Sequence, residues 1–326
     1  MSPFACPARG RPSFRRGQAS RRAVTRSHMS RSGSAGFSSR GARGAARYAA
    51  RRAPLLPMLG VLSACISQPR PTEPAVIPAA LSVPPGYSLV WRDEFDEGPQ
   101  PDPAKWAYDQ HRNRQGWYND ELQYYGRRAR NIRIDAGMLV IEAHAERLNR
   151  ADYRDWGGQS FTSGRLVSRG RARWREGYFE IRARLPCVAG TWPAAWLLPE
   201  YESSRWEGGE IDIFEHVGAD PGKVHHSLQT ATRNFRIGNH PTATSMVPDA
   251  CTAFHTYQLL WTGSMIVMGV DGRIGFAMRR ERLDRWFDRP MYLILNLAIG
   301  GHWGGPVDAG RLPASMQIDY VRVYGK

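Results

Sequence analysis

The stretch Gly177-Tyr-Phe-Glu-Ile-Arg-Ala-Arg-Leu185 alternates strictly between two kinds of side chain. Its odd-numbered residues from Phe179 to Leu185 are apolar, whereas the even-numbered residues between them are charged. A period of two residues is typical of a β-strand with one buried face and one wet face. The stretch therefore predicts a strand that packs against a hydrophobic core on one side only.

Segments of the same kind follow one another from Tyr87 to the end of the chain. Asp135-Ala136-Gly137 and Asp271-Gly272 each separate two apolar runs, which predicts two hairpins. Only a short helical turn is expected, near Glu281–Trp286. The strand candidates are Ser88–Asp93, Ile132–Ile134, Met138–Glu142, Ala194–Leu198, Glu210–Val217, Tyr257–Trp261, Met265–Val270, Arg273–Phe276, Met291–Ala298 and Gln317–Tyr324. This pattern predicts an all-β fold, an antiparallel β-sandwich or jelly roll that forms one domain over residues 87–326.

The net charge of +15 is distributed unevenly along the 326 residues. Residues 1–64 hold 13 of the 45 basic residues and no acidic residue, which leaves 32 basic against 30 acidic residues in the remainder. The excess charge therefore belongs to an Arg-, Gly-, Ser- and Ala-rich leader. A basic arm for nucleic acid is the less favoured interpretation of this leader, and we expect no nucleic-acid partner.

The end of the leader has the order of parts of an export signal. Arg51-Arg52 precedes a weakly apolar run, Ala53 to Ala64, that is too short to span a bilayer. Leu62-Ser-Ala-Cys65 resembles the lipobox of bacterial lipoproteins, which implies acylation of Cys65 and membrane attachment through that anchor alone. The alternative is an ordinary cleaved signal. We expect an exported protein, at the outer membrane or cell surface if lipidated and otherwise secreted or periplasmic, with Met29 as an alternative start.

The segment between the leader and residue 87 has a composition of its own. Residues 65–86 contain six prolines and show no periodicity, which predicts a semi-extended tether. Beyond the tether the chain has two cysteines, Cys187 and Cys251. In an oxidising compartment they are a candidate disulfide, and two independent buried thiols are the alternative.

The strand candidate Gly209-Glu-Ile-Asp-Ile-Phe-Glu215 carries three carboxylates. In a regular strand Glu210 and Asp212 share one face, and Glu215 falls on the apolar face, where an unpaired carboxylate costs several kcal/mol, roughly. A β-bulge near Ile213-Phe214 shifts the phase and places all three in one row. A solvated polar face is the alternative. A row of like charges does not favour folding, but glycoside hydrolysis uses one carboxylate as nucleophile or base and one carboxylic acid, on a strand that curves in a concave sheet.

Tryptophans surround this strand in the sequence. Trp192 and Trp206 lie close to it, and Trp303 lies in the Gly-rich segment Gly300–Gly305. The apolar faces of sugar rings stack on aromatic planes, so a carboxylate row lined by Trp indicates a carbohydrate cleft. Core packing is the alternative for each Trp, and we expect Trp196, beside Leu197-Leu198, to be in the core.

Glu210-Ile-Asp-Ile-Phe-Glu215 resembles the Glu-x-Asp-x-x-Glu signature of glycoside hydrolase family 16, in the bulged form of laminarinase-like members. Other segments look like that family in the same order, over about residues 88–326: Trp91-Arg-Asp-Glu-Phe95, Asn119-Asp-Glu-Leu-Gln-Tyr-Tyr125, Gly177-Tyr-Phe-Glu180, Gly190-Thr-Trp-Pro-Ala-Ala-Trp196, Asn296-Leu-Ala-Ile-Gly-Gly301 and Asp319-Tyr-Val-Arg-Val-Tyr324. The resemblance implies a β-jelly roll with a concave cleft and a retaining endo-hydrolase of β-linked glucan that needs no cofactor for catalysis.

The resemblance also implies roles for single residues. Glu210 would be the nucleophile, Glu215 the general acid/base and Asp212 their modulating partner. The cleft contacts carried over are Trp192, Trp206 and Asn119. A structural calcium, common in relatives, would involve Glu94, the Gly137 carbonyl and Asp319.

One stretch departs from the family pattern. Laminarinase-like enzymes usually read Val-His-Gly-Thr-Leu-His after the catalytic strand, and here Val224-His-His-Ser-Leu-Gln229 has His226 in place of Gly and Gln229 in place of the second His. Adjacent residues on a strand point to opposite faces, so His225 and His226 should not share a metal. His225 is either a sugar contact or a structural histidine.

The sequence therefore predicts one class of substrate, and several alternative functions stay open. We expect a monomeric endo-β-glucanase that cuts β-1,3 linkages by double displacement. The alternatives are a relative acting on mixed-linkage glucan or galactan, a transglycosylase, and a non-catalytic glucan-binding module, which is disfavoured because both glutamates are present.

Overall fold

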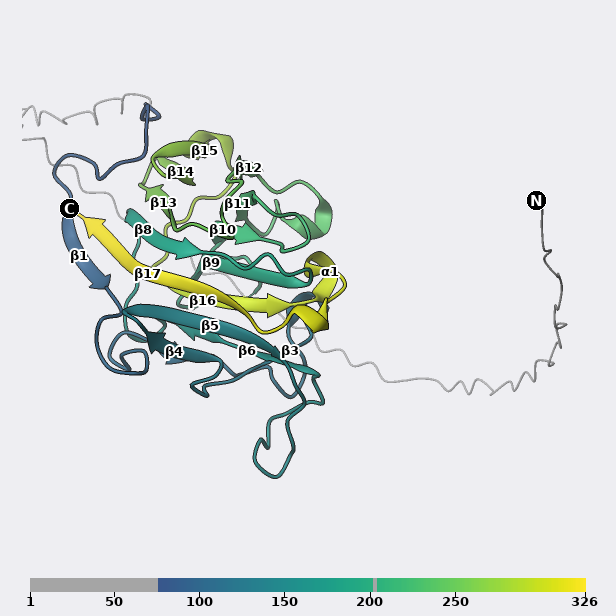
Figure 1. The fold of residues 1–326 in the computed structure, drawn as a ribbon. Helices are drawn as coiled ribbons and strands as arrows, with labels where there is room; N and C mark the ends of the chain where they lie inside the picture. The colour runs from purple at the N-terminus through teal and green to yellow at the C-terminus, as the bar shows by residue number, and fades with distance from the viewer. Residues whose placement is uncertain (1–75, 202–203) are drawn as a thin grey trace, which may run out of the picture. The chain divides into compact units, whose positions relative to one another are not determined.

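The computed structural model describes residues 76–201 and 204–326 (Figure 1). The predicted signal, Cys65 and the first half of the Pro-rich tether lie outside these residues. Within the described ranges, no helix has both the length and the apolar character needed to cross a membrane.

Two β-sheets form the fold, and all but one of their strand pairs are antiparallel (Figure 1). The 10-stranded sheet has the order β15-β14-β13-β8-β17-β5-β6-β3, with β1 beside β17 and β4 beside β5. Its strands are β1 (Ser88–Asp93), β3 (Gln123–Tyr125), β4 (Ile132–Asp135), β5 (Met138–Ala145), β6 (Phe161–Ser163), β8 (Gly177–Arg184), β13 (His255–Trp261), β14 (Met265–Val270), β15 (Arg273–Arg279) and β17 (Ala314–Gly325). The predicted all-β sandwich is confirmed.

The 7-stranded sheet has the order β12-β11-β10-β9-β16-β7-β2, with the acidic strand β10 next to the central strand β9. Its strands are β2 (Ala107–Tyr108), β7 (Arg165–Val167), β9 (Thr191–Pro199), β10 (Glu210–His216), β11 (Lys223–Gln229), β12 (Thr242–Met246) and β16 (Met291–Ile299). Five short helical segments join strands: η1 (Tyr118–Asp120), η2 (Phe235–Ile237), η3 (Arg280–Arg282), α1 (Gly301–Gly304) and η4 (Ala309–Arg311). The helical turn expected near Glu281–Trp286 is shorter and lies earlier, since η3 ends at Arg282, and α1 was not predicted.

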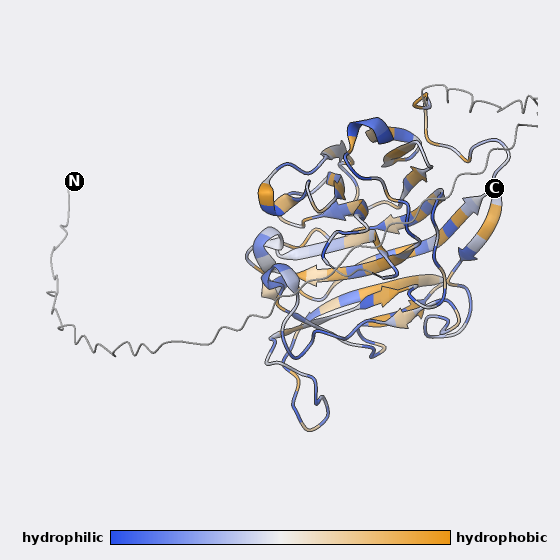
Figure 2. Cartoon of the chain, turned by 180° about the vertical axis from the view of Figure 1, so that it is seen from behind, coloured by the Kyte–Doolittle hydropathy of each residue, from blue (hydrophilic) through white to orange (hydrophobic). Residues whose placement is uncertain are grey.

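The hydrophobic core lies between the two sheets, where apolar side chains of both meet. In β8 the predicted alternation is realised, since Phe179, Ile181 and Ala183 are fully buried. Ile211 of β10 and Leu197 of β9 join the same core from the other sheet. Figure 2 shows apolar residues concentrated along these strands and polar residues in the loops. This packing fixes the inner face of β9, β10 and β16, and the opposite face of these strands is turned away from the core.

Both predicted hairpins form with two-residue turns. Ala136 and Gly137 connect β4 to β5 with φ values of 52° and 72°, and Asp271 and Gly272 connect β14 to β15 with φ values of 51° and 78°. Two successive positive φ angles are the type I′ geometry that matches the twist of the flanking strands.

The folded unit begins before residue 87, where the sequence placed its boundary. Leu81 is buried, and its backbone N–H donates to the Gly272 carbonyl at 2.8 Å. A Cβ atom on Gly269 of β14 would lie 2.9 Å from Leu81 Cδ1, so this glycine makes room for the leucine. The last part of the predicted tether therefore packs on the domain, because Leu81 supplies an apolar anchor among the prolines.

The predicted disulfide between Cys187 and Cys251 is present, with Cα atoms 5.7 Å apart. It joins the segment after β8 to the segment before β13 across 64 residues of sequence. The Cys187 Sγ lies 3.9 Å from Nε2 of His216, the last residue of the acidic strand. The disulfide thus lies beside the end of β10.

Candidate active site

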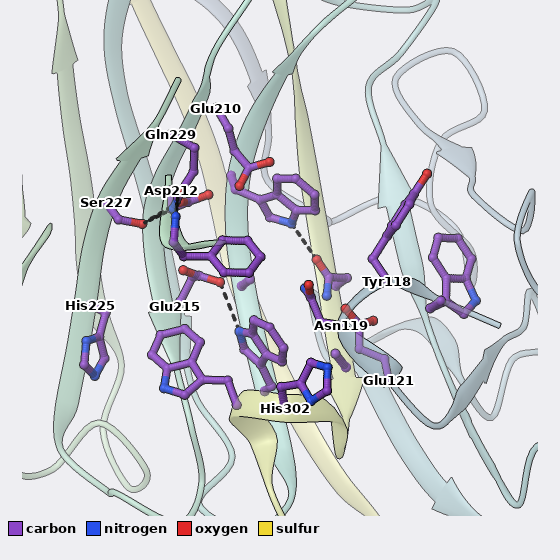
Figure 3. A pocket seen from close by; sticks show the side chains of 18 of the residues that line it. Tyr118, Asn119, Glu121, Glu210, Asp212, Glu215, His225, Ser227, Gln229 and His302 are labelled. Carbon is purple, nitrogen blue, oxygen red and sulfur yellow. Dashed lines mark hydrogen bonds between the residues drawn. The ribbon is translucent and has the colours of Figure 1, made fainter. Parts of the chain in front are cut away.

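Strand β10 contains the β-bulge that the sequence predicts. Against β11, Asp212 pairs with Ser227 and Glu215 pairs with His225, so that two residues of β10 face one residue of its neighbour. The same shift occurs against β9. As a result the apolar residues between Asp212 and Glu215 are buried in the core, and both carboxylates line the outer face of the sheet with Glu210. The one-row hypothesis is confirmed (Figure 3).

The three carboxylates lie along a cleft with a volume of about 460 Å³, a size that suits a small ligand or a few sugar units. Several aromatic side chains form parts of its walls. The lining includes Trp117, Tyr118, Asn119, Glu121, Trp192, Trp196, Arg205, His225, Phe235, Asn296, His302 and Trp303. Of the sequence-predicted cleft contacts, the structure therefore brings Trp192, Asn119, His225 and Trp303 together at the row.

Trp206, the remaining predicted contact, holds Glu210. Its indole Nε1–H donates to Glu210 Oε2 at 3.1 Å, and its φ of 61° is in the left-handed region. The ring packs edge-on against Phe235 at 5.4 Å between centroids, and the Arg205 guanidinium lies over it at 4.4 Å. Glu210 is thus oriented by a tryptophan that is itself fixed from two sides.

Asp212 is the most enclosed of the three carboxylates. The Ser227 hydroxyl donates to its Oδ2 at 2.5 Å, and Gln229 Nε2 donates to the same oxygen at 3.3 Å. The Gln229 Oε1 accepts from the backbone N–H of Phe235 at 3.0 Å. Gln229, the residue that departs from the family pattern, therefore ties the loop that carries Phe235 to the middle of the row.

Glu215 is held by Trp192, whose Nε1–H donates to Oε1 at 3.1 Å (Figure 3). Trp192 packs edge-on against Trp303, and Trp303 packs edge-on against His225, with centroids 5.2 and 4.9 Å apart. His225 faces the cleft, while its neighbour His226 is buried on the core side of β11. The two histidines do not share a ligand position, as the sequence predicted.

Burial raises the pKa values of two of these carboxyl groups. Burial raises the pKa of Asp212 to about 6, although the hydrogen bonds from Ser227 and Gln229 oppose the rise. Burial, and then the charges of Asp212 and Glu210, raise the pKa of Glu215 well above its usual range. A carboxyl group that stays protonated near neutral pH can act as a general acid.

Trp196 was expected in the core, and this prediction was wrong. Strand β9 alternates so that Leu197 enters the core while Trp196 lines the cleft, with its Nε1–H donating to Asn296 Oδ1 at 2.7 Å. The guanidinium of Arg165 lies over its ring at 4.9 Å. The Trp196 indole is half-buried. One face of the ring contacts this guanidinium, and the side chain forms part of the cleft lining.

Further cleft residues were not singled out from the sequence as site residues. Glu121 lies on the cleft wall, where its Oε2 accepts from Gln123 Nε2 at 2.9 Å and burial raises its pKa. Asn119 precedes it in η1 with a φ of 58°, a conformation that asparagine tolerates well. A Cβ atom on Gly301 would lie 2.7 Å from the Asn119 carbonyl, so this glycine lets α1 approach η1. Asn119 was a predicted contact, whereas the only signal for Glu121 was its place in the family-like segment 119–125.

The residues proposed for a structural calcium do not fit that role as they are arranged. Arg322 binds both oxygens of Glu94, at 2.9 and 2.8 Å, and its hydrogen bond lowers the pKa of that carboxyl. Arg182 donates to Asp319 at 2.5 Å. Both carboxylates are neutralised by guanidinium groups, which leaves the Gly137 carbonyl without the charged partners that calcium prefers.

A row of carboxylates, two of which have raised pKa values, on the floor of an aromatic cleft in a two-sheet sandwich, defines a glycoside hydrolase of the jelly-roll class. The chain belongs to the glycosyl hydrolases family 16, whose sequence profile matches residues 116–322.

Relatives at 44–46% identity agree with this assignment. The chain is 46% identical to a β-glucanase of Rhodothermus marinus over 255 residues, which cover 74% of this chain and 86% of that protein. The crystal structure of a laminarinase from Rhodothermus marinus has a TM-score of 0.67, with 46% identity and coverage of 73% of this chain and 97% of that one. The structure of SCLam, a non-specific endo-β-1,3(4)-glucanase, has a TM-score of 0.72, with 44% identity and coverage of 76% and 94%.

Proposed function

We propose that this protein is a retaining endo-β-glucanase that cleaves β-1,3 linkages in laminarin-type glucans. The observation that carries the proposal is the bulged strand, which presents Glu210, Asp212 and Glu215 to one aromatic cleft. The relatives support the choice of substrate, since the R. marinus protein is a laminarinase and a SCLam variant was crystallised with 1,3-β-D-cellotriosyl-glucose.

In the first step, the Glu210 carboxylate attacks the anomeric carbon as the glycosidic C–O bond breaks. Protonated Glu215 delivers its proton to the departing oxygen. Because the Trp192 indole N–H occupies Oε1, the acidic proton belongs on Oε2. Trp206 keeps Glu210 pointed along the cleft by its hydrogen bond to Oε2. Positioning and electrostatic stabilisation of this kind account for much of enzymatic rate enhancement.

In the second step, the Glu215 carboxylate takes a proton from a water molecule that attacks the same carbon, and Glu210 is released. Burial, and then the negative charge of Asp212, raise the pKa of Glu215, which helps it to recover its proton for the next cycle. Two displacements retain the configuration of the anomeric carbon. No step of this chemistry calls for a cofactor.

The substrate is tested with a panel of polysaccharides: laminarin, lichenan, agarose and carrageenan. We expect reducing ends from laminarin first and from lichenan more slowly, and none from the galactans. Glu210→Ala should abolish the activity. Glu215→Ala should also do so, and azide should restore turnover only of a substrate whose leaving group needs no proton, because azide replaces the base of the second step and not the acid of the first. Cleavage of agarose or carrageenan in preference to laminarin would instead identify a galactan hydrolase, and wild-type activity of Glu210→Ala would refute the mechanism.

Transglycosylation is a second outcome of the same chemistry, in which a sugar hydroxyl replaces water in the second displacement. Product lengths on a short laminari-oligosaccharide distinguish the two. We propose hydrolysis, which yields only products shorter than the substrate.

For the location, we propose export and lipid attachment through Cys65. The support is the order of charged flank, apolar run and Leu62-Ser-Ala-Cys65 in the sequence. Radiolabelled palmitate should be incorporated into the wild-type protein and not into Cys65→Ser, which should be released from membranes. Equal membrane retention of both proteins would exclude the lipid anchor.

A further inference from the structure

Ile213 occupies the extra position of the β10 bulge. It has no partner residue in the register with β9 or with β11. Its side chain is buried in the core, and its carbonyl lies in the chain between Asp212 and Glu215. A buried backbone carbonyl costs free energy unless a donor reaches it. The group that satisfies this carbonyl therefore helps to fix the shape of the bulge.

His226 of β11 supplies that donor. The distance from His226 Nδ1 to the Ile213 carbonyl oxygen is 2.6 Å, and the distance from Nε2 to Ser245 Oγ of β12 is 2.8 Å. Both bonds form together when Nδ1 carries the proton and donates, and Nε2 accepts from the serine hydroxyl. The ring is fully buried, and burial lowers its pKa to about 4, so it is neutral near neutral pH.

The surrounding strands leave room for this bridge. A Cβ atom on Gly275 of β15 would lie 2.0 Å from Ser245 Oγ and 3.0 Å from His226 Nε2. The glycine is needed there for space, because any side chain would collide with the pair. The imidazole is thus confined between β10, β12 and β15, and it connects the bulge to a strand two places away in the sheet.

We propose that His226 is a positioning residue for the catalytic row, which acts by holding the Ile213 carbonyl and thereby sets Glu215 relative to Glu210. His226 faces the core, whereas the carboxylates face the cleft, so it acts through the backbone and not by contact with substrate. The proposal rests on the proposed function, in which Glu215 protonates the leaving group. Loss of the bridge should shift Glu215 by a fraction of an ångström to about 1 Å, a displacement that can cost up to about a hundred-fold in rate.

Two conservative variants separate the two hydrogen bonds. His226→Asn places an amide N–H close to the position of Nδ1 and can still donate to Ile213, whereas His226→Gln reaches only the position of Nε2 and Ser245. We expect His226→Asn to keep kcat on laminarin within about three-fold, and His226→Gln to lower it by about ten- to a hundred-fold with little change in KM. Leu259→Ala, a buried control in β13 outside the site, should lower the thermal midpoint and leave kcat at 20 °C unchanged.

A substrate with an activated leaving group shows where His226→Gln acts. A 2,4-dinitrophenyl glycoside of laminaribiose needs no proton from Glu215, so its kcat/KM should fall much less than that of laminarin. Equal kcat values for wild type and His226→Gln would overturn the proposal. Equal losses for the Asn and Gln variants, or equal losses on both substrates, would do the same, because they indicate general destabilisation.

Failure of the proposed function is recognised separately, since wild type would then cleave no β-glucan. The two variants are in that case compared on the polysaccharide that the wild type does cleave. A crystal structure of His226→Gln provides a readout that needs no substrate. A displaced Glu215 carboxyl relative to Glu210 would support the proposal, and an unchanged row would contradict it.

Discussion

Replacement of Asp212 by Asn should make the folded protein more stable near neutral pH while it impairs catalysis. Asp212 is 3% exposed, and burial raises its pKa from 3.8 to about 6. Each pKa unit corresponds to about 1.36 kcal/mol, so the ionised carboxylate lowers the free energy of unfolding by about 3 kcal/mol. The raised pKa means that this cost is absent below pH 3.8, grows between pH 3.8 and 6, and is complete above pH 6.

Urea unfolding followed by tryptophan fluorescence measures this cost at two pH values. We expect Asp212→Asn to be more stable than wild type by about 3 kcal/mol at pH 7.5, and to differ by less than about 1 kcal/mol at pH 4. Asp109→Asn is the matched control, for which we expect the opposite change in the free energy of unfolding. Burial opposes ionisation of Asp109, but His111 and Arg165 outweigh it and lower the pKa of that carboxyl. This variant should lose stability at pH 7.5.

The reasoning fails if Asp212→Asn is less stable than wild type at pH 7.5, or if its advantage is the same at both pH values. Either result would mean that the buried carboxylate is not an electrostatic burden on the fold. The expected result would instead show that the catalytic carboxylates destabilise the folded protein, and that packing elsewhere in the sandwich offsets this effect.

Three further perturbations test other contacts. Trp206→Phe removes the hydrogen bond to Glu210 and keeps the aromatic wall, so kcat should fall by about ten-fold with laminarin, measured from initial rates. Replacement of Cys187 and Cys251 by Ser should lower the free energy of unfolding by about 2–5 kcal/mol in urea and leave kcat at 20 °C nearly unchanged. Gln229→Leu removes the tie between the Phe235 loop and the row, so it should raise KM as well as lower kcat, and a change in neither would contradict the contact.

Much of the fold could be predicted because its strands alternate. β1 and β14 have the bounds that the sequence predicts, and both hairpin turns lie where Gly follows Asp or Ala. The bulge in β10 was predictable for a different reason. A regular strand would bury Glu215 in the core, and that electrostatic cost excludes the regular register.

Other elements were missed because their residues do not alternate between apolar and polar side chains. In β3 the side chains from Gln123 to Tyr125 are buried on both faces, so polarity does not alternate with burial. Trp196 was misplaced because its neighbours are leucines, whereas its surroundings depend on Arg165, a residue from a distant strand. The short helix α1 lies beside η1, where His302 Nε2 is 2.9 Å from Asp120 Oδ2, a contact that no local pattern indicates.

The central claim is that Glu210 is the nucleophile at one end of a row that the bulge completes. Mass spectrometry of the protein after reaction with an activated 2-deoxy-2-fluoro-laminaribioside tests it most directly, since such a sugar forms the glycosyl-enzyme but is released slowly. We expect a single added sugar on the peptide that contains Glu210, attached to that carboxylate. Attachment to Glu215 or Asp212, or turnover with inversion and no adduct, would contradict the account.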